Sequence, residues 1–274
     1  MNKISFIVTT FNRDTLLYKS VESLLPYLKI NPGWSIIIVD QGEMTEEKEN
    51  WLNDNNFDSI NYSRKNNCQQ LFYYQVPYNA GLSFCRNYGV KKAKEIECDY
   101  CVISSDSFLI NNSILKLNSV IKNINRTGYD KCGFELNNCT VGWEAFLRLV
   151  PNEAFELDFI DKSSLTDGKK YFDIDICRNF YVATTESLLN VPFDNLLKLA
   201  EHEDQAWRYN QAGYQSMWTN LITADKMTDR PVEYDRLRNT NFNEGIKYLK
   251  QKWGIKGWVK YIHLERAKEF CKGE

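Results

Sequence analysis

Near its start the chain reads Ile4-Ser5-Phe6-Ile7-Val8-Thr9-Thr10-Phe11-Asn12, a short apolar run that passes directly into polar residues. Downstream, apolar residues recur at three- and four-residue spacing, namely Leu17, Val21, Leu24 and Leu28. That spacing is typical of the buried face of a helix, whereas a short run rich in β-branched residues favours a buried strand. The sequence therefore predicts a strand followed by a helix, the first unit of an alternating α/β fold.

The same alternation continues to about residue 125. Pro32-Gly33 ends the helix, and the β-branched run Ile36-Ile37-Ile38-Val39 predicts a second strand covered on both faces. Further strands are predicted at residues 72–76 and 100–103, and further helices at residues 82–95 and 114–124. Such alternation predicts a doubly wound, mostly parallel sheet.

The second half of the chain is less regular. Strands are predicted at residues 132–136 and 179–183, a helix at 201–212, and a polar loop at 152–170. No Gly/Pro-rich linker separates the halves, so we expect one domain over residues 1–242, composed of residues 1–125 and 126–242.

Composition bounds the class of protein. The chain has 274 residues, 43% of them hydrophobic, which suits a sizeable globular core, and its net charge of -2 provides no field to attract nucleic acid. Cys98 and Cys101 form a C-x2-C pair without a second pair at zinc-site spacing, so buried thiols are the better interpretation. We see no signal peptide and no apolar stretch long enough to span a membrane, and we expect a cytoplasmic protein with reduced cysteines.

Polar residues follow several of the predicted strands. Thr10 and Asn12 follow the first strand, Asp40 the second, Asn79 the third and Asp106 the fourth. Ligands of open α/β sheets bind beyond the carboxyl ends of the strands. We therefore expect these side chains to converge on one crevice.

Each of these residues has a chemical and a structural interpretation. Asp40 is suited to accept hydrogen bonds from a base or ribose, but a turn cap is equally compatible. Gly81 permits close backbone approach at a helix start, where anions are favoured, and Arg86 suits bidentate phosphate binding, although a lone Arg is more often simply exposed. Asp106 suits a Mg2+ or Mn2+ ion whose other ligands are diphosphate oxygens, or else caps the next helix.

The run Glu201-His202-Glu203-Asp204 places three carboxylates and an imidazole in four residues. Clustered like charges raise the pKa of some members, which suits a general base. The alternative is a solvated acidic helix start, which the helix dipole favours.

These motifs, in this order, resemble the GT-A-fold glycosyltransferases, most closely family 2 of the inverting enzymes, over about residues 3–220. The resemblance rests on Ile7-Val8-Thr9-Thr10-Phe11-Asn12-Arg13, Ile38-Val39-Asp40-Gln41-Gly42, Asn79-Ala80-Gly81-Leu82-Ser83-Phe84-Cys85-Arg86-Asn87, Ile103-Ser104-Ser105-Asp106 and Glu203-Asp204. Residues 178–184 and 201–204 also look like the β1,4-N-acetylgalactosaminyltransferase and fukutin-related group.

The resemblance implies a fold, a reaction and roles. The fold would add a small second antiparallel sheet. The reaction would move a sugar from a nucleoside diphosphate sugar, with UDP the expected nucleotide, to a hydroxyl of a glycan or lipid-linked acceptor by metal-assisted single displacement. Residues 1–125 would form the nucleotide-binding half and 126–242 the acceptor half. The implied nucleotide-sugar ligands are Thr10, Asn12, Asp40, Asn79, Gly81 and Arg86.

Three further roles are implied at the reaction centre. Asp106 would hold Mn2+ or Mg2+ as the last Asp of the family's Asp-x-Asp, Asp204 would be the catalytic base, and Glu203 would contact donor or acceptor. The first Asp of that motif is Ser104 here, so Ser104 and Ser105 would offer hydroxyls to the ribose. This departure keeps open a catalytically silent nucleotide-sugar-binding protein. A nucleotidyltransferase is less favoured, because residues 9–14 are not a Gly-rich basic loop.

The C-terminal segment, residues 243–274, is basic and rich in aromatic residues, including Tyr248, Trp253, Trp258 and Tyr261. We expect a helical tail. Such a segment either lies on an anionic membrane surface, which would suit peripheral contact with a lipid-linked acceptor, or packs its rings on the catalytic domain.

Overall fold

Strand β1 (Ile4–Thr10) forms the centre of the large sheet in the computed structural model, which describes residues 2–55, 57–59, 70–139, 143–162, 170–229 and 232–265. All seven residues of β1 are buried, and β1 pairs in parallel with β2 (Trp34–Asp40) and β5 (Tyr100–Ser105). Parallel strands without alternating polarity must be covered on both faces, as the sequence predicts.

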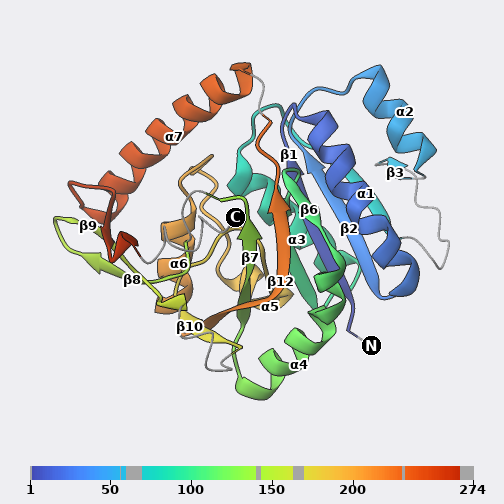
Figure 1. Ribbon diagram of the computed structural model, residues 1–274. Helices are drawn as coiled ribbons and strands as arrows, with labels where there is room; N and C mark the ends of the chain where they lie inside the picture. Colours follow the sequence, from blue (N-terminus) through green and yellow to red (C-terminus); the bar gives the residue numbers. More distant parts are fainter. Residues whose placement is uncertain are drawn as a thin grey trace.

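The sheet extends from β1 in both directions (Figure 1). On one side β2 pairs in parallel with β4 (Leu71–Gln75), and β4 with β3 (Asp58–Ser59). On the other side β11 (Tyr181–Thr184) is antiparallel to β5 and to β7 (Lys131–Asn137), and β7 is parallel to β12 (Ser216–Lys226). Two short strands, β6 (Phe108–Ile110) and β10 (Phe172–Ile174), pair antiparallel with β12.

Helices cover both faces of this sheet. The predicted apolar face of α1 (Asp14–Ile30) packs in one core cluster with residues of α2 (Glu46–Asp54) and α4 (Leu117–Thr127), the latter preceded by η1 (Asn112–Lys116). Residues of α3 (Leu82–Glu95) and α5 (Thr185–Asn190) belong to the cluster on the other face. The doubly wound arrangement predicted for the first half is confirmed.

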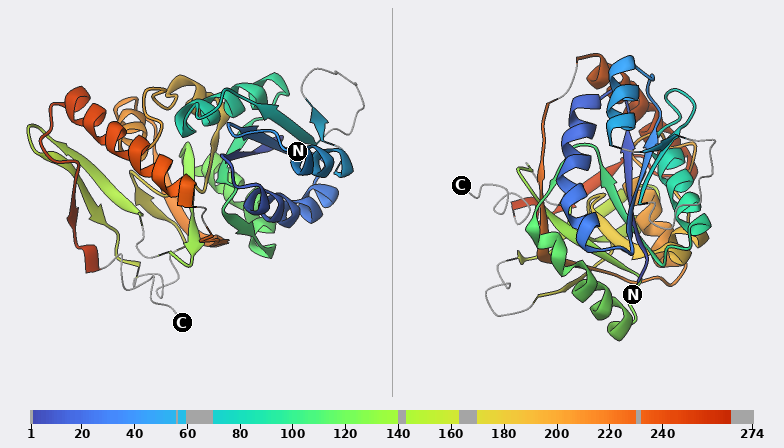
Figure 2. Two further views of the ribbon diagram at one scale, coloured as in Figure 1. Left: turned by 90° about the horizontal axis from the view of Figure 1, so that it is seen from above. Right: turned by 90° about the vertical axis from the view of Figure 1, so that its right-hand side faces the viewer.

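A small second sheet lies beside α6 (His202–Gln211) and α7 (Val232–Trp253) (Figures 1 and 2). It contains β8 (Ala145–Val150), β9 (Ala154–Phe159) and β13 (Val259–Ile262). β8 and β9 are antiparallel as expected, but β13 is parallel to β9, so the sheet is mixed.

Two sequence-based predictions differ from this arrangement. The polar stretch 152–170 contains β9, because Glu156 is paired with Arg148 and Lys260 and the strand buries its apolar residues; residues 163–169 lie outside the described part. The helix expected in the C-terminal segment starts before residue 243, at Val232, and β13 follows its end.

The described cysteines are free and buried, namely Cys85, Cys98, Cys101, Cys132, Cys139 and Cys177. Cys68 and Cys271 lie outside the described residues. The expected buried thiols at Cys98 and Cys101 are confirmed. Within the described part of the chain, no helix has the length and apolarity needed to cross a membrane.

Candidate active site

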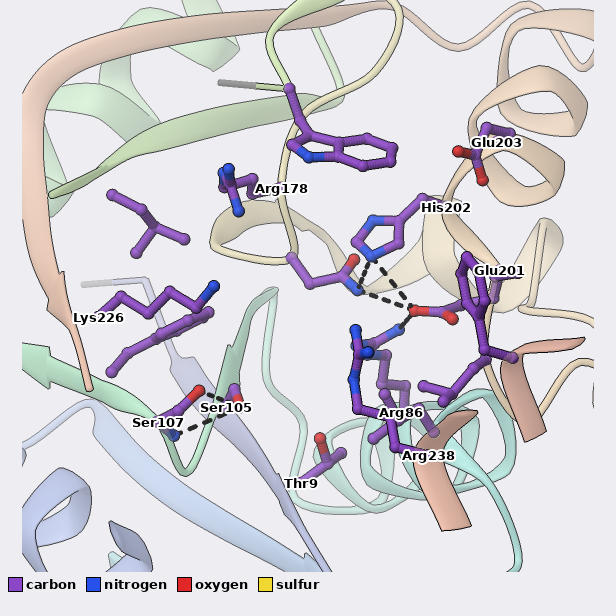
Figure 3. Close-up of a pocket in the computed structure, with 18 of the residues that line it drawn as sticks. Thr9, Arg86, Ser105, Ser107, Arg178, Glu201, His202, Glu203, Lys226 and Arg238 are labelled. Atoms are coloured by element: carbon purple, nitrogen blue, oxygen red, sulfur yellow. Dashed lines mark hydrogen bonds and ion pairs between the residues drawn. The ribbon is translucent and has the colours of Figure 1, made fainter. Parts of the chain in front are cut away.

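A cavity of about 310 Å³ opens beyond the carboxyl ends of β1 and β5 (Figure 3). The strands contribute Thr9 and Ser105 to its lining, and the start of α6 contributes the run 201–203. Helix α7 forms another wall with Tyr234, Arg238 and Phe242. The cavity thus lies at the edge of the sheet where the sequence places a ligand site.

The lining is rich in cations. It contains Arg13, Arg86, Arg178, Lys226 and Arg238, against two carboxylates, Glu201 and Glu203. Figure 3 shows Arg178, Lys226 and Arg238 on different sides of the cavity. Guanidinium and ammonium groups converging on one cavity favour a ligand with several negative charges.

Asp106 lies at the end of β5 with no exposed surface. Its Oδ2 accepts hydrogen bonds from Thr10 Oγ1 at 2.8 Å and Arg13 Nε at 3.0 Å, and its Oδ1 accepts from Ser105 Oγ at 3.0 Å and from Arg13 Nη2. Burial raises the pKa of Asp106, while Arg13 and these hydrogen bonds oppose that rise. The carboxylate is thereby fixed in a two-pronged ion pair with Arg13.

This geometry bears on the metal that the resemblance implies. A carboxylate accepts about four hydrogen bonds, and Asp106 already accepts four, two of them from a guanidinium. Among the described residues, no three His, Cys, Asp or Glu side chains are grouped so as to hold a metal ion. As arranged here, the residues around Asp106 do not fit a divalent cation, so the metal role of Asp106 stays a prediction from the resemblance.

Glu201 is the centre of a second network. It forms an ion pair with Arg86, and it accepts a hydrogen bond from Asn179 Nδ2 at 2.9 Å. Burial alone would raise the pKa of Glu201, but Arg86 and His202 outweigh burial and lower it to about 2. Arg86 is therefore neutralised by Glu201, while its Nε, buried without a partner, adjoins the cavity.

His202 faces the same cavity beside Trp143, with ring centroids 5.7 Å apart. Burial lowers the pKa of His202 to about 4, so the ring is neutral near pH 7. The amide Nδ2 of Asn179 also lies 3.0 Å from Nε2 of His202 and faces the Glu201 carboxylate, so this amide nitrogen donates to both. Nε2 is then the acceptor nitrogen, and Nδ1 carries the proton.

Glu203 has a carboxyl group whose pKa differs strongly from its ordinary value. It is buried and lines the cavity, and neither of its oxygens has a hydrogen-bond partner. Burial, together with the nearby charges of Glu201 and Asp204, raises the pKa of Glu203 to about 8. The indole N–H of Trp258, another cavity residue, lies close enough to Glu203 to oppose that rise, but it forms no well-aligned hydrogen bond with either oxygen. Unpaired buried polar groups at a cavity are suited to meet a ligand.

Asp204 has a different position. It has no exposed surface, does not line the cavity, and accepts from Arg208 Nε at 2.9 Å and Trp253 Nε1 at 2.9 Å, with Lys252 Nζ at 2.6 Å. These contacts join α6 to α7. The expected catalytic base is held by three donors outside the cavity.

The expected nucleoside ligands of the first two strands are also held by the protein. Asp40 is buried, and its oxygens accept from Lys48 Nζ at 2.7 Å, Tyr73 Oη at 2.8 Å and the Gly42 amide at 2.7 Å. Asn12 accepts from the Glu43 amide and lines a neighbouring hollow that also contains Arg13.

The remaining predicted ligands surround a narrow hollow beneath α7. Thr10, Asn79 and Gly81 line it together with Arg13, Tyr234 and Arg238. Asn79 accepts a hydrogen bond from Asn241 of α7 at 2.9 Å, and the Gly81 amide donates to Gln41. Ser105 lines the main cavity, whereas Ser104 is buried outside it with an unpartnered hydroxyl.

The sequence pattern misses most of the cationic lining. Arg13 lies in a quoted motif but has no assigned role, Arg178 lies in an irregular segment, Lys226 ends β12, and Arg238 lies on α7. Their basic character is visible in the sequence, but their convergence depends on the crossing of α7 over the sheet edge. Of the tryptophans, Trp143 and Trp258 reach the cavity, while Trp218 is fully buried.

Neither a protein-family model nor a curated protein matches this sequence. Among solved structures, the chain is similar to GalNAc-T7 in a crystal with UDP, GalNAc and Mn2+, with a TM-score of 0.63, 12% identity, and coverage of 83% of this chain and 44% of that one. It is also similar to S. aureus TarS 1–349 in complex with UDP, with a TM-score of 0.57, 15% identity, and coverage of 93% and 72%.

A further crystal structure of S. aureus TarS 1–349 matches with a TM-score of 0.55 and 17% identity, over 82% of this chain and 60% of that one. The chain thus spans less than two thirds of two of these three structures. These likenesses establish the GT-A fold. Membership of family 2 in particular stays a prediction.

Proposed function

We propose that this protein is a glycosyltransferase that moves a sugar from a nucleoside diphosphate sugar, with UDP the expected nucleotide, to an acceptor hydroxyl. The observation that carries the proposal is the cavity itself, in which cationic side chains and a partnerless carboxyl group, Glu203, share one space at the carboxyl edge of a GT-A sheet. The similar GalNAc-T7 and TarS structures contain UDP, which supports the choice of nucleotide.

In the proposed reaction the acceptor oxygen forms a bond to the anomeric carbon as the bond from that carbon to the diphosphate oxygen breaks. The acceptor proton passes to Glu203, whose pKa near 8 is close to physiological pH and therefore suits a general base. Cationic side chains stabilise the departing diphosphate. A single displacement inverts the anomeric configuration. Asp204 positions α6 in this scheme, because its oxygens are already bonded outside the cavity.

The acceptor side of the cavity carries Trp143, His202 and Trp258. The Nδ1–H of His202 and the indole N–H of Trp258 are donors for sugar hydroxyls, and the Trp143 ring offers a face on which a sugar can stack. A glycan or the sugar of a lipid-linked acceptor has this chemistry.

The function is tested by incubating the protein with UDP-sugars and a panel of saccharide acceptors, and by measuring released UDP and the glycosylated product. We expect transfer by the wild type and a loss of at least about a hundredfold in kcat for Glu203→Gln, because general base catalysis contributes roughly 10²–10⁴-fold. Glu153→Gln, at an exposed position, is the matched control.

Two results would contradict this assignment. If Glu203→Gln kept full turnover, Glu203 would not be the general base. UDP binding without transfer or hydrolysis of any UDP-sugar would favour a silent binding protein, the alternative that Ser104 suggests.

A further inference from the structure

We propose that the diphosphate of the donor is held by arginine and lysine side chains, with Arg13 in the place of a divalent cation. This inference rests on the proposed function, because it concerns how the same cavity binds the leaving group. It differs from the metal-assisted reaction that the resemblance implies.

The first support is the bonding of Asp106. Both oxygens of this buried carboxylate are occupied, and Arg13 provides one donor to each. A metal ion could bind Asp106 only after displacing a guanidinium that forms a buried ion pair, whose disruption is costly. The cation at the end of β5 is therefore a side chain of this protein.

The second support is the part of the Arg13 guanidinium that forms no hydrogen bond to Asp106. A guanidinium has five N–H groups, and among the described residues Asp106 accepts from Nε and Nη2 of Arg13 while Nη1 has no acceptor. Arg13 lines the main cavity and both adjoining hollows. Its guanidinium carbon lies 4.3 Å from the centre of the Tyr234 ring, which fixes its orientation from α7. Arg13 is thus positioned to bond Asp106 and a phosphate together.

The third support is the surrounding charge. In the part of the chain that the structure describes, neither Arg178 nor Arg238 has an ion-pair partner, although both line the cavity (Figure 3). Lys226 adds a further positive charge to the lining. Planar guanidinium groups bind phosphate in a bidentate manner. Together with Arg13 these side chains can balance the charge of a diphosphate.

The serine at position 104 agrees with this arrangement. The usual first Asp of the motif would add a second carboxylate near Asp106, which one arginine could not balance. Ser104 is uncharged and fully buried, so a single negative charge faces Arg13 at the end of β5. The departure from the Asp-x-Asp pattern thus leaves Arg13 a single carboxylate to pair with at the end of β5.

The test is isothermal titration calorimetry of the full chain with UDP, once with EDTA and once with MnCl2. We expect the same dissociation constant in both. Binding that requires Mn2+ would overturn the inference while leaving the proposed function intact. Failure to bind UDP, GDP, CDP or TDP in either condition would overturn both.

Variants separate the roles of the side chains. Arg178→Gln and Arg238→Gln remove charges that have no partner, so the fold should persist, and each should weaken UDP binding with EDTA by at least about tenfold. The double variant Arg13→Gln with Asp106→Asn replaces the buried ion pair by neutral polar groups, so that neither charge is left buried alone, and it should weaken binding at least as much. Arg126→Gln, exposed on α4, is the control. Unchanged affinity in the three cavity variants would overturn the inference.

Discussion

Glu203 is a buried acid kept without a hydrogen-bond partner, an arrangement that stability alone would not favour. Its pKa is raised from 4.5 to about 8 on folding, chiefly by burial. Between these values the folded protein holds a proton that the unfolded chain has lost. The contribution of Glu203 to stability is therefore fully present below about pH 4.5 and decreases as the pH rises through about 8.

This linkage gives a prediction for Glu203→Gln. The variant cannot ionise, so it should be more stable than the wild type at pH 8 by on the order of a few kcal/mol, and the difference should disappear near pH 4. Urea unfolding of both proteins across this range measures it. A difference independent of pH would show that the carboxyl is already ionised in the folded state.

In the proposed reaction the same residue would also set the pH dependence of turnover. A general base acts in its deprotonated form, so we expect kcat to rise with pH and to level off above about pH 8. Stability and activity should therefore change in opposite directions with pH.

Among the elements, α3 depends on an unusual start. Gly81 precedes it with a φ of 98°, and a Cβ at this position would lie 2.8 Å from the Cα of Lys198. Gly128, at the end of α4, also has a positive φ of 78°, but a Cβ there would meet nothing within 4 Å. Comparing substitutions at the two glycines therefore separates the cost of a left-handed backbone from the cost of a steric clash with Lys198.

We expect Gly128→Ala to cost about 1 kcal/mol, the strain of a left-handed alanine. Gly81→Ala should cost clearly more, because the segment around Lys198, which borders the cavity through Leu199, must also move. Chemical denaturation of both variants gives the comparison. Equal costs would mean that the backbone at Lys198 adapts freely.

Regular elements could be predicted from the sequence where periodicity was strong, as in β1, β2, β5, α1 and α4. β12 was not predicted, since Ser216–Lys226 mixes polar and apolar residues and pairs with β7 through a register shift. β9 was hidden by Glu156 and Asp158: Glu156 is paired with Arg148 and Lys260, and Asp158 lies 2.7 Å from Nδ1 of His263, all from other segments. Such compensation depends on tertiary contacts.

The sequence predicted the location of the cavity better than the roles of the individual residues. Ligands were expected at the sheet edge, and the cavity lies there. Asp40 and Asp204 were expected at the ligand, but buried cations and indoles already occupy their oxygens. A motif gives the position of a carboxylate along the chain. It does not give the direction in which an α-helix or a β-strand presents it.

At the scale of the whole molecule, the C-terminal segment packs against the GT-A domain through several of its aromatic residues. Tyr248 donates to Asp194 at 3.0 Å, Trp253 donates to Asp204, and Trp258 packs on Phe242 with ring centroids 4.9 Å apart. Rings used in this way are not available to insert into a bilayer.

Peripheral membrane contact would therefore depend on Tyr261, which is 41% exposed, and on exposed lysines such as Lys247 and Lys256. We expect no co-sedimentation of the full chain with vesicles containing phosphatidylserine at physiological salt, and no difference for Lys247→Glu with Lys256→Glu. Binding by the wild type that this double variant loses would restore the membrane hypothesis.

Helix α7 borders the cavity with its first half and contacts α6 with its last turn. Its first turn places Tyr234 against Arg13, and Trp253 in its last turn donates to Asp204 of α6. Under the proposed function, a helix that contacts both the nucleotide and the acceptor would couple their binding free energies, and such coupling is reciprocal. The factor by which a bound nucleotide changes the affinity for the acceptor equals the factor by which a bound acceptor changes the affinity for the nucleotide. The two affinities, measured separately and together, therefore form a closed thermodynamic cycle that gives the coupling free energy between nucleotide and acceptor.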